Sequence, residues 1–331
     1  MRLKLSNIMI PVESEKNIKN LVCKQFKIKM EDLEGFRILR QSVDARKKNN
    51  VRYNFQVEVE VPDKYRSLLG SPGVSEPAPS TEPAYPKWPH ARQPVVVGFG
   101  PAGIFAALYL ARCGAHPVVI ERGERIEERQ QSVSRFLTAR TLDPESNVQF
   151  GEGGAGAFSD GKLNTNVNSE YNQFVLDEFH KHGAPGEVTY QQNPHVGTDY
   201  LSRVVKNIRT EIESLGGEFH FNTLFESFEK DGDRIILRCR DGKSFITDHL
   251  LLGLGHSARD TIRMLHARGL QMEAKAFSIG VRMEHLQRDI NRMQYGPSAH
   301  LLPPASYKGA VHLRDRGVYT FCMCPGGTVM A

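Results

Sequence analysis

The stretch "VVVGFGPAGIFAALYLARCGAHPVVIERG" runs from Val95 to Gly123. It begins with an apolar run typical of a strand buried in a parallel sheet. Glycines in the spacing GxGxxG follow, then a helix of small residues, then a second apolar run that ends at Glu121. This order predicts a strand, a tight turn, a helix and a second parallel strand, which is the first unit of a Rossmann-like α/β fold.

Each residue of the turn has its own role in a predicted nucleotide site. Gly98 permits the sharp exit from the strand, Gly100 leaves room for a pyrophosphate beside the backbone, and Gly103 lets the helix lie close to the sheet. Pro101 suits the first helical turn, where its missing N–H has no partner in any case, and Ala102 follows it in that turn. The free N–H groups and the positive helix end would then face a diphosphate.

The acid at the end of the second strand points to a ribose. Glu121 lies 18 residues after Gly103. A carboxylate at this position accepts hydrogen bonds from both ribose hydroxyls and repels a 2′-phosphate, which disfavours NADP. The alternative is a plain βαβ turn with an accidental acid at its end. The agreement of strand, spacing, helix and acid favours an ADP moiety, with Arg122 beside it; FAD and NAD both contain ADP, so the turn does not distinguish them.

The chain beyond Gly123 departs from a plain NAD-binding domain, which would continue at once with a third strand. Instead the glycine-rich "GEGGAGAFSDGKLNT" of residues 151–165 has five glycines within 11 residues. Apolar periodicity predicts helices over 124–140, 170–183, 198–217 and 257–269. Short strands are predicted within 218–255, the last of them in "LLLGLG", and a β-rich tail follows.

The first 68 residues predict a small α+β domain. A strand over 3–12 is followed by a helix over 15–26, which Ser14 would cap. Two further strands over 36–46 and 51–61 are joined by the polar turn "KKNN". The second of these alternates apolar and polar residues, which predicts one buried face: Val51, Tyr53, Phe55, Val57, Val59 and Val61.

A proline-rich segment separates this domain from the glycine turn. It has seven prolines in the 23 residues from Pro72 to Pro94 and predicts a stiff, extended linker. Trp88 lies within it and is expected to hold the linker against a domain surface; the alternative is that its ring stacks on a ligand.

Composition bounds the protein class. The 331 residues suffice for two domains, and the net charge of +5 permits anionic partners without requiring nucleic acid. The five scattered cysteines favour a reducing compartment, so we expect a cytoplasmic protein. The N-terminus lacks the apolar core of a signal peptide. Glycines and a proline interrupt the uncharged stretch from Pro94 to Ala111, so no membrane span is expected.

Several stretches together carry a resemblance to a known family: "VVVGFGPAGIFAAL", "NVQFGEGGAGAFSDGKLNT", "GHSARDT", "AFSIGVRMEH" and "YTFCMCPGG". On these motifs the chain resembles the two-dinucleotide-binding flavoproteins and, more narrowly, a family of uncharacterised bacterial FAD-dependent dehydrogenases, over essentially its whole length. "LLLGLG" takes the place of their ATG turn, with Gly253 and Leu254 in place of the usual Ala and Thr.

The resemblance implies a fold and a cofactor. The expected fold is an α/β, Rossmann-like FAD-binding domain with an inserted α+β region, preceded by the small α+β domain. FAD would lie extended, with its ADP half on the glycine turn and Glu121 and its isoalloxazine at Gly151–Gly156. Gly153, Gly154 and Gly255 join the cofactor-binding residues on this basis.

The expected organisation has five parts. They are a small α+β domain (1–68), a Pro-rich linker (69–93), the first part of the FAD-binding domain (94–165), a helical insertion with small strands and the return to the FAD domain (166–256), and a substrate-side β-rich region (257–331). The chain ends at "PGGTVMA", where relatives continue with a further segment against the flavin, so we expect it to be truncated.

The resemblance also implies an activity. We expect an FAD-dependent oxidoreductase that transfers a hydride through the flavin to or from a small molecule not identified by the sequence, with NAD(P)H as a candidate electron donor. Such chemistry needs no obligatory side-chain acid or nucleophile, so no catalytic residue is assigned, and no metal is expected. Two alternatives are a flavin- or nucleotide-binding protein without turnover and an inactive fragment. The oligomeric state is left open.

Other motifs have plainer alternatives. In the glycine-rich loop, Lys162 could lie near the charge of a reduced flavin. Ser257, three residues before Asp260, is expected to cap the next helix, and His256 could approach the cofactor. "HKHG", which ends at Gly183, is expected to be a helix end rather than part of a zinc site.

Two further candidates concern the ends of the chain. Cys322 and Cys324 would alternate along a strand, as a redox pair or as unrelated thiols. The basic residues of the first hairpin could contact RNA or assist assembly, although a solvated, charge-protected edge is the interpretation we favour: Arg37, Arg40, Arg46, Lys47 and Lys48.

Overall fold

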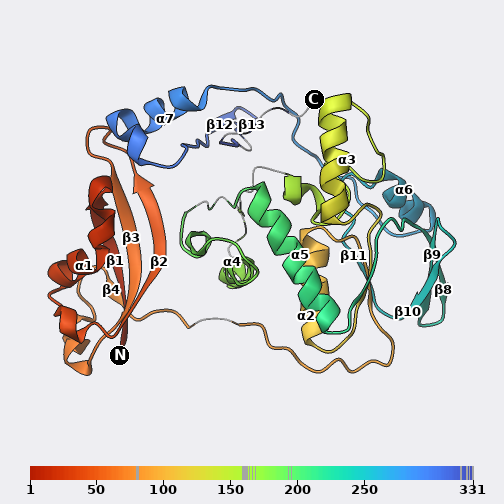
Figure 1. Cartoon of the computed structure of the whole chain (residues 1–331), viewed down its shortest axis with the longest axis horizontal. Helices are drawn as coiled ribbons and strands as arrows, with labels where there is room; N and C mark the ends of the chain where they lie inside the picture. Colours follow the sequence, from red (N-terminus) through yellow and green to blue (C-terminus); the bar gives the residue numbers. More distant parts are fainter. Residues whose placement is uncertain are drawn as a thin grey trace.

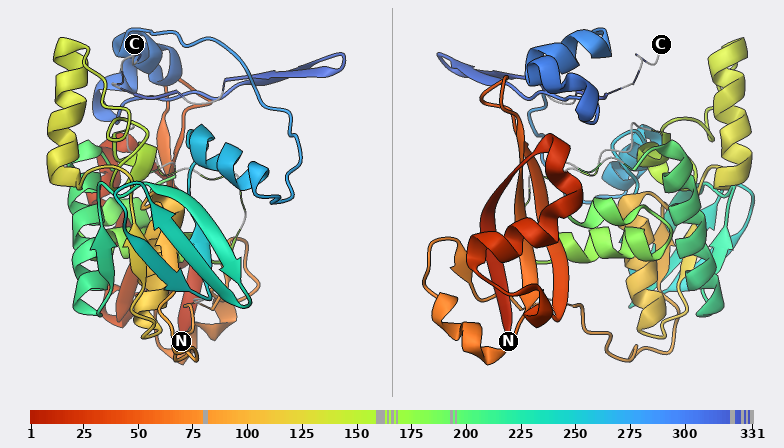
Figure 2. Two further views of the ribbon diagram at one scale, coloured as in Figure 1. Left: turned by 90° about the vertical axis from the view of Figure 1, so that its right-hand side faces the viewer. Right: turned by 60° about the vertical axis from the view of Figure 1, so that its left-hand side comes forward.

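The computed structural model describes all residues except 80–81, 159–162, 164, 166, 168, 193, 195, 321–322, 326, 328 and 330–331. An N-terminal unit lies at one side of the molecule and a larger unit at the other (Figure 1). The proline-rich segment connects them along the bottom of that view. Residues from the C-terminal part of the chain connect them along the top, and Figure 2 shows the same arrangement from two further sides.

The N-terminal unit is an antiparallel sheet in the order β2-β3-β1-β4. Its strands are β1 (Arg2–Pro11), β2 (Gly35–Asp44), β3 (Arg52–Glu60) and β4 (Val74–Ser75), and one helix, α1 (Ile18–Phe26), packs on it. The six apolar residues predicted for the inner face of β3 and its ends are all buried, together with Leu3, Leu5, Ile8 and Ile10 of β1. The predicted alternation is therefore confirmed.

The start of α1 was predicted wrongly. Residues Val12–Asn17 form a 3-10 helix, and α1 begins at Ile18 after Asn17, which makes no side-chain capping bond. Ser14 lies inside the 3-10 segment and is not the cap. Val12 is buried in the same core as β1, so the chain turns tightly to keep it there before the α-helix begins.

The larger unit contains a parallel sheet in the order β11-β5-β6-β7. Its strands are β5 (Val95–Val97), β6 (Val118–Ile120), β7 (Glu218–His220) and β11 (Leu250–Leu252). Helix α2 (Pro101–Arg112) joins β5 to β6 and packs against α5 (Thr198–Ser214). The Rossmann-like α/β fold is thus confirmed. The third of these strands in chain order, β7, enters the sheet only after a long insertion.

The insertion holds α3 (Ile126–Ala139), α4 (Asn172–Lys181) and α5. After β7, an antiparallel sheet in the order β10-β9-β8 is formed by β8 (Phe225–Asp231), β9 (Arg234–Cys239) and β10 (Ser244–Thr247). Leu237 of β9 and Leu265 of α6 (Arg259–Ala267) share a core with Val95, Val97 and Ile120 of the parallel sheet. The parallel sheet is therefore covered by α2 and α5 on one side and by this small sheet and α6 on the other.

The tail is less β-rich than predicted. It forms α7 (Gln287–Tyr295), a 3-10 helix over Gly296–Leu301, and a hairpin of β12 (Ala310–Leu313) and β13 (Arg316–Tyr319). Leu302 is buried in the core of the N-terminal unit, and Tyr295 packs against that core. The helix was missed because its nine residues, QRDINRMQY, are mostly polar and short in apolar positions.

Trp88 packs as predicted. Its backbone N–H donates to Cys113 O (2.8 Å), its indole Nε1–H donates to Arg92 O (3.1 Å), and its ring lies edge-on to His249. None of the helices that the structure describes has the length and apolar character needed to cross a bilayer.

Candidate functional site

A cavity of about 460 Å³ opens at the carboxyl ends of β5, β6 and β11. This is the edge at which open α/β sheets bind ligands. Four segments line it: the glycine turn after β5, the end of β6, the glycine-rich loop and the turn after β11. Among the lining residues are Gly98, Gly100, Pro101, Ala102, Glu121, Arg122, Gly151, Gly154, Gly156, Gly255 and His256.

The three glycines of the turn have different roles. A Cβ on Gly98, whose φ is +93°, would lie 2.4 Å from Gly253 O, and a Cβ on Gly103 would lie 1.8 Å from Gly98 O. Both positions are therefore closed by packing. A Cβ on Gly100 would meet only Gly154 Cα, at 3.6 Å, and Gly100 lines the cavity. Of the three, Gly100 is the one whose missing side chain leaves space for a ligand.

Helix α2 presents its N-terminus to the cavity. Pro101 is its first residue, and no acidic residue lies in its first turn. The unpaired N–H groups of a helix start attract anions, and an acid in this turn would oppose them. Together with the open space at Gly100, the turn suits a diphosphate.

Glu121 is buried and already bound to the backbone. Its Oε2 accepts from Phe99 N (2.8 Å), and its Oε1 accepts from Gly123 N (3.0 Å) and Gly151 N (3.0 Å). A carboxylate has about four acceptor positions, so about one remains, on Oε2. Glu121 therefore fastens the glycine turn to the glycine-rich loop, a role that the sequence analysis missed.

The glycine-rich loop packs directly on the glycine turn. Gly153 N donates to Phe99 O (2.8 Å), and a Cβ on Gly154 would lie 2.9 Å from Gly100 Cα. A Cβ on Gly153 would lie 2.8 Å from the Cβ of Ala157. Gly154 thus lies at the cavity, whereas Gly153 faces the packing beneath it. Lys162 lies outside the described residues.

Arg122 closes one side of the cavity. Its guanidinium lies over the Phe150 ring (4.4 Å) and pairs with Glu145 (3.1 Å) and with Asp260 of α6. Although burial raises the pKa of Asp260, hydrogen bonding to Arg122 lowers it below its usual range. The mouth of the cavity therefore carries an ion pair between the β6 end and α6.

Ser257 is not the predicted cap. Helix α6 follows Ala258 with no side-chain capping bond, and Asp260 is paired with Arg122. Ser257 Oγ lies 3.0 Å from His256 Nδ1 and donates to Gln149 Oε1 (3.3 Å). The two side chains lie at the rim of the cavity, which His256 and Ser257 both line.

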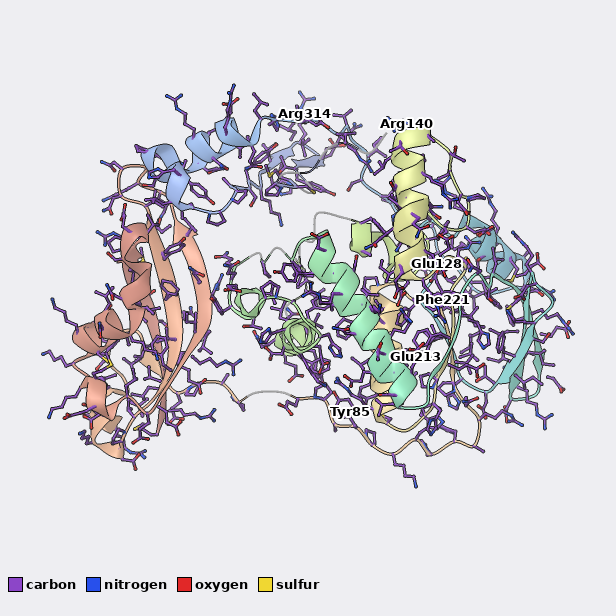
Figure 3. All side chains as sticks on the ribbon, in the orientation of Figure 1. Tyr85, Glu128, Arg140, Glu213, Phe221 and Arg314 are labelled. Carbon is purple, nitrogen blue, oxygen red and sulfur yellow. The ribbon has the colours of Figure 1, made fainter. Side chains whose placement is uncertain are left out.

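The motif "HKHG" ends a helix, as predicted, and also enters an ion cluster. Glu178, His182 and Glu211 each place a ligand atom within 4.8 Å of the others. The guanidinium of Arg112 donates to both Glu178 oxygens (2.7 Å each) and to Glu211 Oε1 (2.8 Å). The cation Arg112 therefore already binds both carboxylates of this group. The cluster also contacts the linker, because Arg112 donates to Tyr85 Oη (2.9 Å). Figure 3 labels Tyr85 near the lower end of α2.

Acid should weaken this cluster. Burial raises the pKa of Glu211, but hydrogen bonds from Arg112 and His182 outweigh it and lower the pKa from 4.5 to about 2. The carboxylate therefore stabilises the fold above pH ~4.5, and this contribution is lost as the pH falls toward ~2. We expect Glu211→Gln to lower the free energy of unfolding by up to ~3 kcal/mol at neutral pH and by little near pH 2. Urea denaturation across this pH range measures the difference.

The matched control lies on the same helix. Glu213, labelled in Figure 3, is more exposed than Glu211 and lies 3.8 Å from Arg209. Glu213→Gln should change stability by less than ~1 kcal/mol at either pH. Equal losses in the two variants would contradict a special role for Glu211.

The remaining candidates lie away from the cavity. Cys322 lies outside the described residues, and Cys324 is exposed and not in a strand, so the predicted alternation is not seen at that position. In the N-terminal hairpin, Arg37 lies opposite Glu58, Arg46 pairs with Asp44, and Lys48 Nζ donates to Gln294 O. Arg46 and Lys48 therefore have partners within the chain, and Glu58 opposite Arg37 pairs with Arg2, which favours the charge-protected edge.

Three families match successive parts of the chain. Residues 92–246 match the family described as FAD binding domain, and residues 276–331 match FAD-dependent protein, C-terminal domain-like. Residues 2–60 match a Domain of unknown function (DUF8436). The first match contains β5, the glycine turn, Glu121 and the glycine-rich loop.

Similar proteins were found among curated sequences and solved structures. A relative from Clostridium beijerinckii, named Uncharacterized protein, is 44% identical over 349 residues; the match takes in 100% of this chain, which spans 64% of the relative. Thioredoxin reductases from Lactococcus lactis and, in an atypical form, Desulfovibrio vulgaris Hildenborough are 19% and 16% identical, with TM-scores of 0.28. These matches cover 49% and 50% of this chain and 34% and 37% of the two structures.

Three observations agree on the cofactor. The cavity has a glycine turn with space for a diphosphate, an acid at the end of the second strand, and a glycine-rich loop beside both. These features lie in the segment that matches the FAD binding domain, and a second match at residues 276–331 is also to FAD-dependent proteins. Residues 92–246 are therefore similar to FAD binding domains, and the findings support FAD as the cofactor.

Proposed function

We propose that the protein is an FAD-dependent oxidoreductase that passes a hydride through the flavin to or from a small-molecule substrate. The observation that carries this is the cavity in which the glycine turn, the end of β6 and the glycine-rich loop meet. Flavins accept and release hydrides, so the bound cofactor would supply the redox chemistry and the protein would position it. Because the chain spans 64% of its relative, the activity is proposed for the whole protein.

The geometry of the cavity supports a set of proposed cofactor contacts. The turn of Gly98, Gly100, Pro101, Ala102 and Gly103 would hold the diphosphate at the start of α2. Glu121 has about one acceptor position left, so we expect it to bind one ribose hydroxyl rather than two.

The other side of the cavity would hold the rest of FAD. Arg122 would lie beside the adenosine, since it stacks on Phe150 at the rim. The backbone of Gly151–Gly156, with Gly154 at the cavity and Gly153 beneath it, would approach the flavin, and Gly255 would contact it from the turn after β11. Loops with so little side-chain bulk allow close approach of a planar ring and exclude water once it is bound.

We also propose an electron donor, a division of the chain into parts and a location for the protein. NAD(P)H is the candidate electron donor, because a nicotinamide donates the hydride that a flavin accepts. The proposal also includes the narrower resemblance to uncharacterised bacterial FAD-dependent dehydrogenases. It further includes the five-part division of the chain and a reducing, cytoplasmic location. Cys23, Cys113, Cys239 and Cys324, the cysteines that the structure describes, are not in disulfides.

Spectroscopy of the purified chain tests the proposal. We expect FAD to copurify, or to bind when added, and to give the visible flavin absorption of a yellow protein. Anaerobic addition of NADH or NADPH should then bleach that absorption. A chain that takes up no FAD would overturn the proposal, whereas bound FAD that no donor reduces would leave a flavin-binding protein without turnover.

A further inference from the structure

A buried arginine lies directly beneath the glycine-rich loop. Arg129 of α3 has no exposed surface and is the largest of the fully buried side chains. Its helical spacing explains the burial, since Ile126 and Val133, three residues before and four after it, face the same interior. A charged side chain is rarely buried to this extent unless a particular arrangement depends on it.

The guanidinium binds the loop at successive points. Its Nε donates to Asn147 O (2.9 Å), and its Nη1 lies within hydrogen-bonding distance of Gly151 O (3.3 Å), Glu152 O (2.6 Å) and Gly154 O (2.8 Å). The Cζ atom of the guanidinium also lies 4.7 Å from the centre of the Phe158 ring. One side chain therefore contacts Asn147, which precedes the loop, and the loop itself from Gly151 to Phe158.

Opposite charges hold Gly151 from both sides. Its N–H donates to Glu121 and its carbonyl accepts from Arg129. The loop is also tied from α5, because Arg209 Nε donates to Glu152 Oε1 (2.8 Å) while Glu152 Oε2 accepts from Ile126 N (2.7 Å). The carbonyls of Gly151, Glu152 and Gly154 therefore face the buried guanidinium of Arg129.

We propose that Arg129 is the positioning residue for the cofactor loop: by gathering the carbonyls of Gly151, Glu152 and Gly154, it holds the backbone of residues 151–156 against the FAD cavity. This inference rests on the proposed cofactor contacts of that loop. Among the described residues, the second guanidinium nitrogen, Nη2, finds no hydrogen-bond acceptor, so the hydrogen bonds of Arg129 all go to backbone carbonyls through Nε and Nη1. The fork of donors is what suits several carbonyls at once, and a lysine cannot reproduce it.

The test compares buried Arg129 with partly buried Arg112. Arg129→Lys and Arg129→Met remove the fork, and Arg112→Met is the control, because Arg112 makes its ion pairs with Glu178 and Glu211 away from the cavity. We expect all three to lower thermal stability, but only the Arg129 variants to weaken FAD binding, by ~10-fold or more, with Lys the milder. The circular dichroism of bound flavin should change in Arg129→Lys, because it reports how the ring is held.

A second readout needs no cofactor. Hydrogen exchange in the apo protein should speed up in peptides covering residues 147–158 for Arg129→Lys, and not for Arg112→Met. If the wild type binds no FAD, the proposed function fails, and this exchange measurement still decides the inference. The inference would be overturned if Arg129→Lys exchanged hydrogen and bound FAD like the wild type. It would also be overturned if Arg112→Met lost as much FAD affinity as the Arg129 variants.

Discussion

Replacing Gly100 by valine is expected to abolish FAD binding while the fold stays intact. Gly100 has φ −81° and ψ −173°, an extended conformation that valine adopts without strain. Its Cβ would meet only Gly154 Cα, at an ordinary 3.6 Å, and the two γ-carbons would extend into the space where a diphosphate approaches the helix start. FAD affinity should fall by ~100-fold or more, whereas the thermal midpoint of the apo protein should change little.

Gly103→Ala provides the matched contrast within the same motif. Its Cβ would lie 1.8 Å from Gly98 O, so α2 would have to move away from the sheet. We expect this smaller substitution to cause the larger loss of stability, seen as a lower midpoint in thermal and urea unfolding. If Gly100→Val instead unfolds the protein, or binds FAD like the wild type, the assignment of Gly100 to the diphosphate is wrong.

This contrast marks where the sequence was informative. The GxGxxG spacing predicted the strand, turn and helix correctly because local backbone geometry demands glycine there. It also assigned packing roles to Gly98 and Gly103 and open space to Gly100, and the structure has the three positions that way. The spacing did not identify the residues around these glycines, because Gly253 and Gly154 lie 155 and 54 residues beyond Gly98 and Gly100 and approach them only in the folded chain.

Two causes account for what sequence reasoning missed. Arg129 and Glu152 are charged, and charged residues usually mark a solvated surface. Helix α7 was missed because its nine residues are mostly polar. A signal for Arg129 was nonetheless present, since Ile126, Arg129 and Val133 share one face of α3. Helical periodicity predicts which face is buried, but not that a cation lies on it.

The second large effect concerns Glu121. Considered as a ribose ligand alone, it would matter only to binding. The structure gives it three backbone donors, Phe99, Gly123 and Gly151, and Glu121→Ala would leave all three without an acceptor in a buried region. Each stranded donor costs ~1–3 kcal/mol, so we expect the apo protein to lose ~3 kcal/mol or more of unfolding free energy, in addition to its affinity for FAD.

Two further variants make this expectation specific. Glu121→Gln keeps one carbonyl oxygen for Gly123 and Gly151 but turns an amide NH₂ toward Phe99 N–H. Its unfolding free energy should therefore fall by less than that of Glu121→Ala. Glu128→Ala, an exposed acid labelled on α3 in Figure 3, removes the same charge and should be nearly silent. Urea unfolding without FAD ranks the three. A Glu121→Ala protein that unfolds like the wild type and differs only in binding would mean that the carboxylate serves the ribose alone. If the loss of unfolding free energy is largest for Glu121→Ala, smaller for Glu121→Gln and smallest for Glu128→Ala, the Glu121 side chain joins the two glycine segments before any cofactor binds.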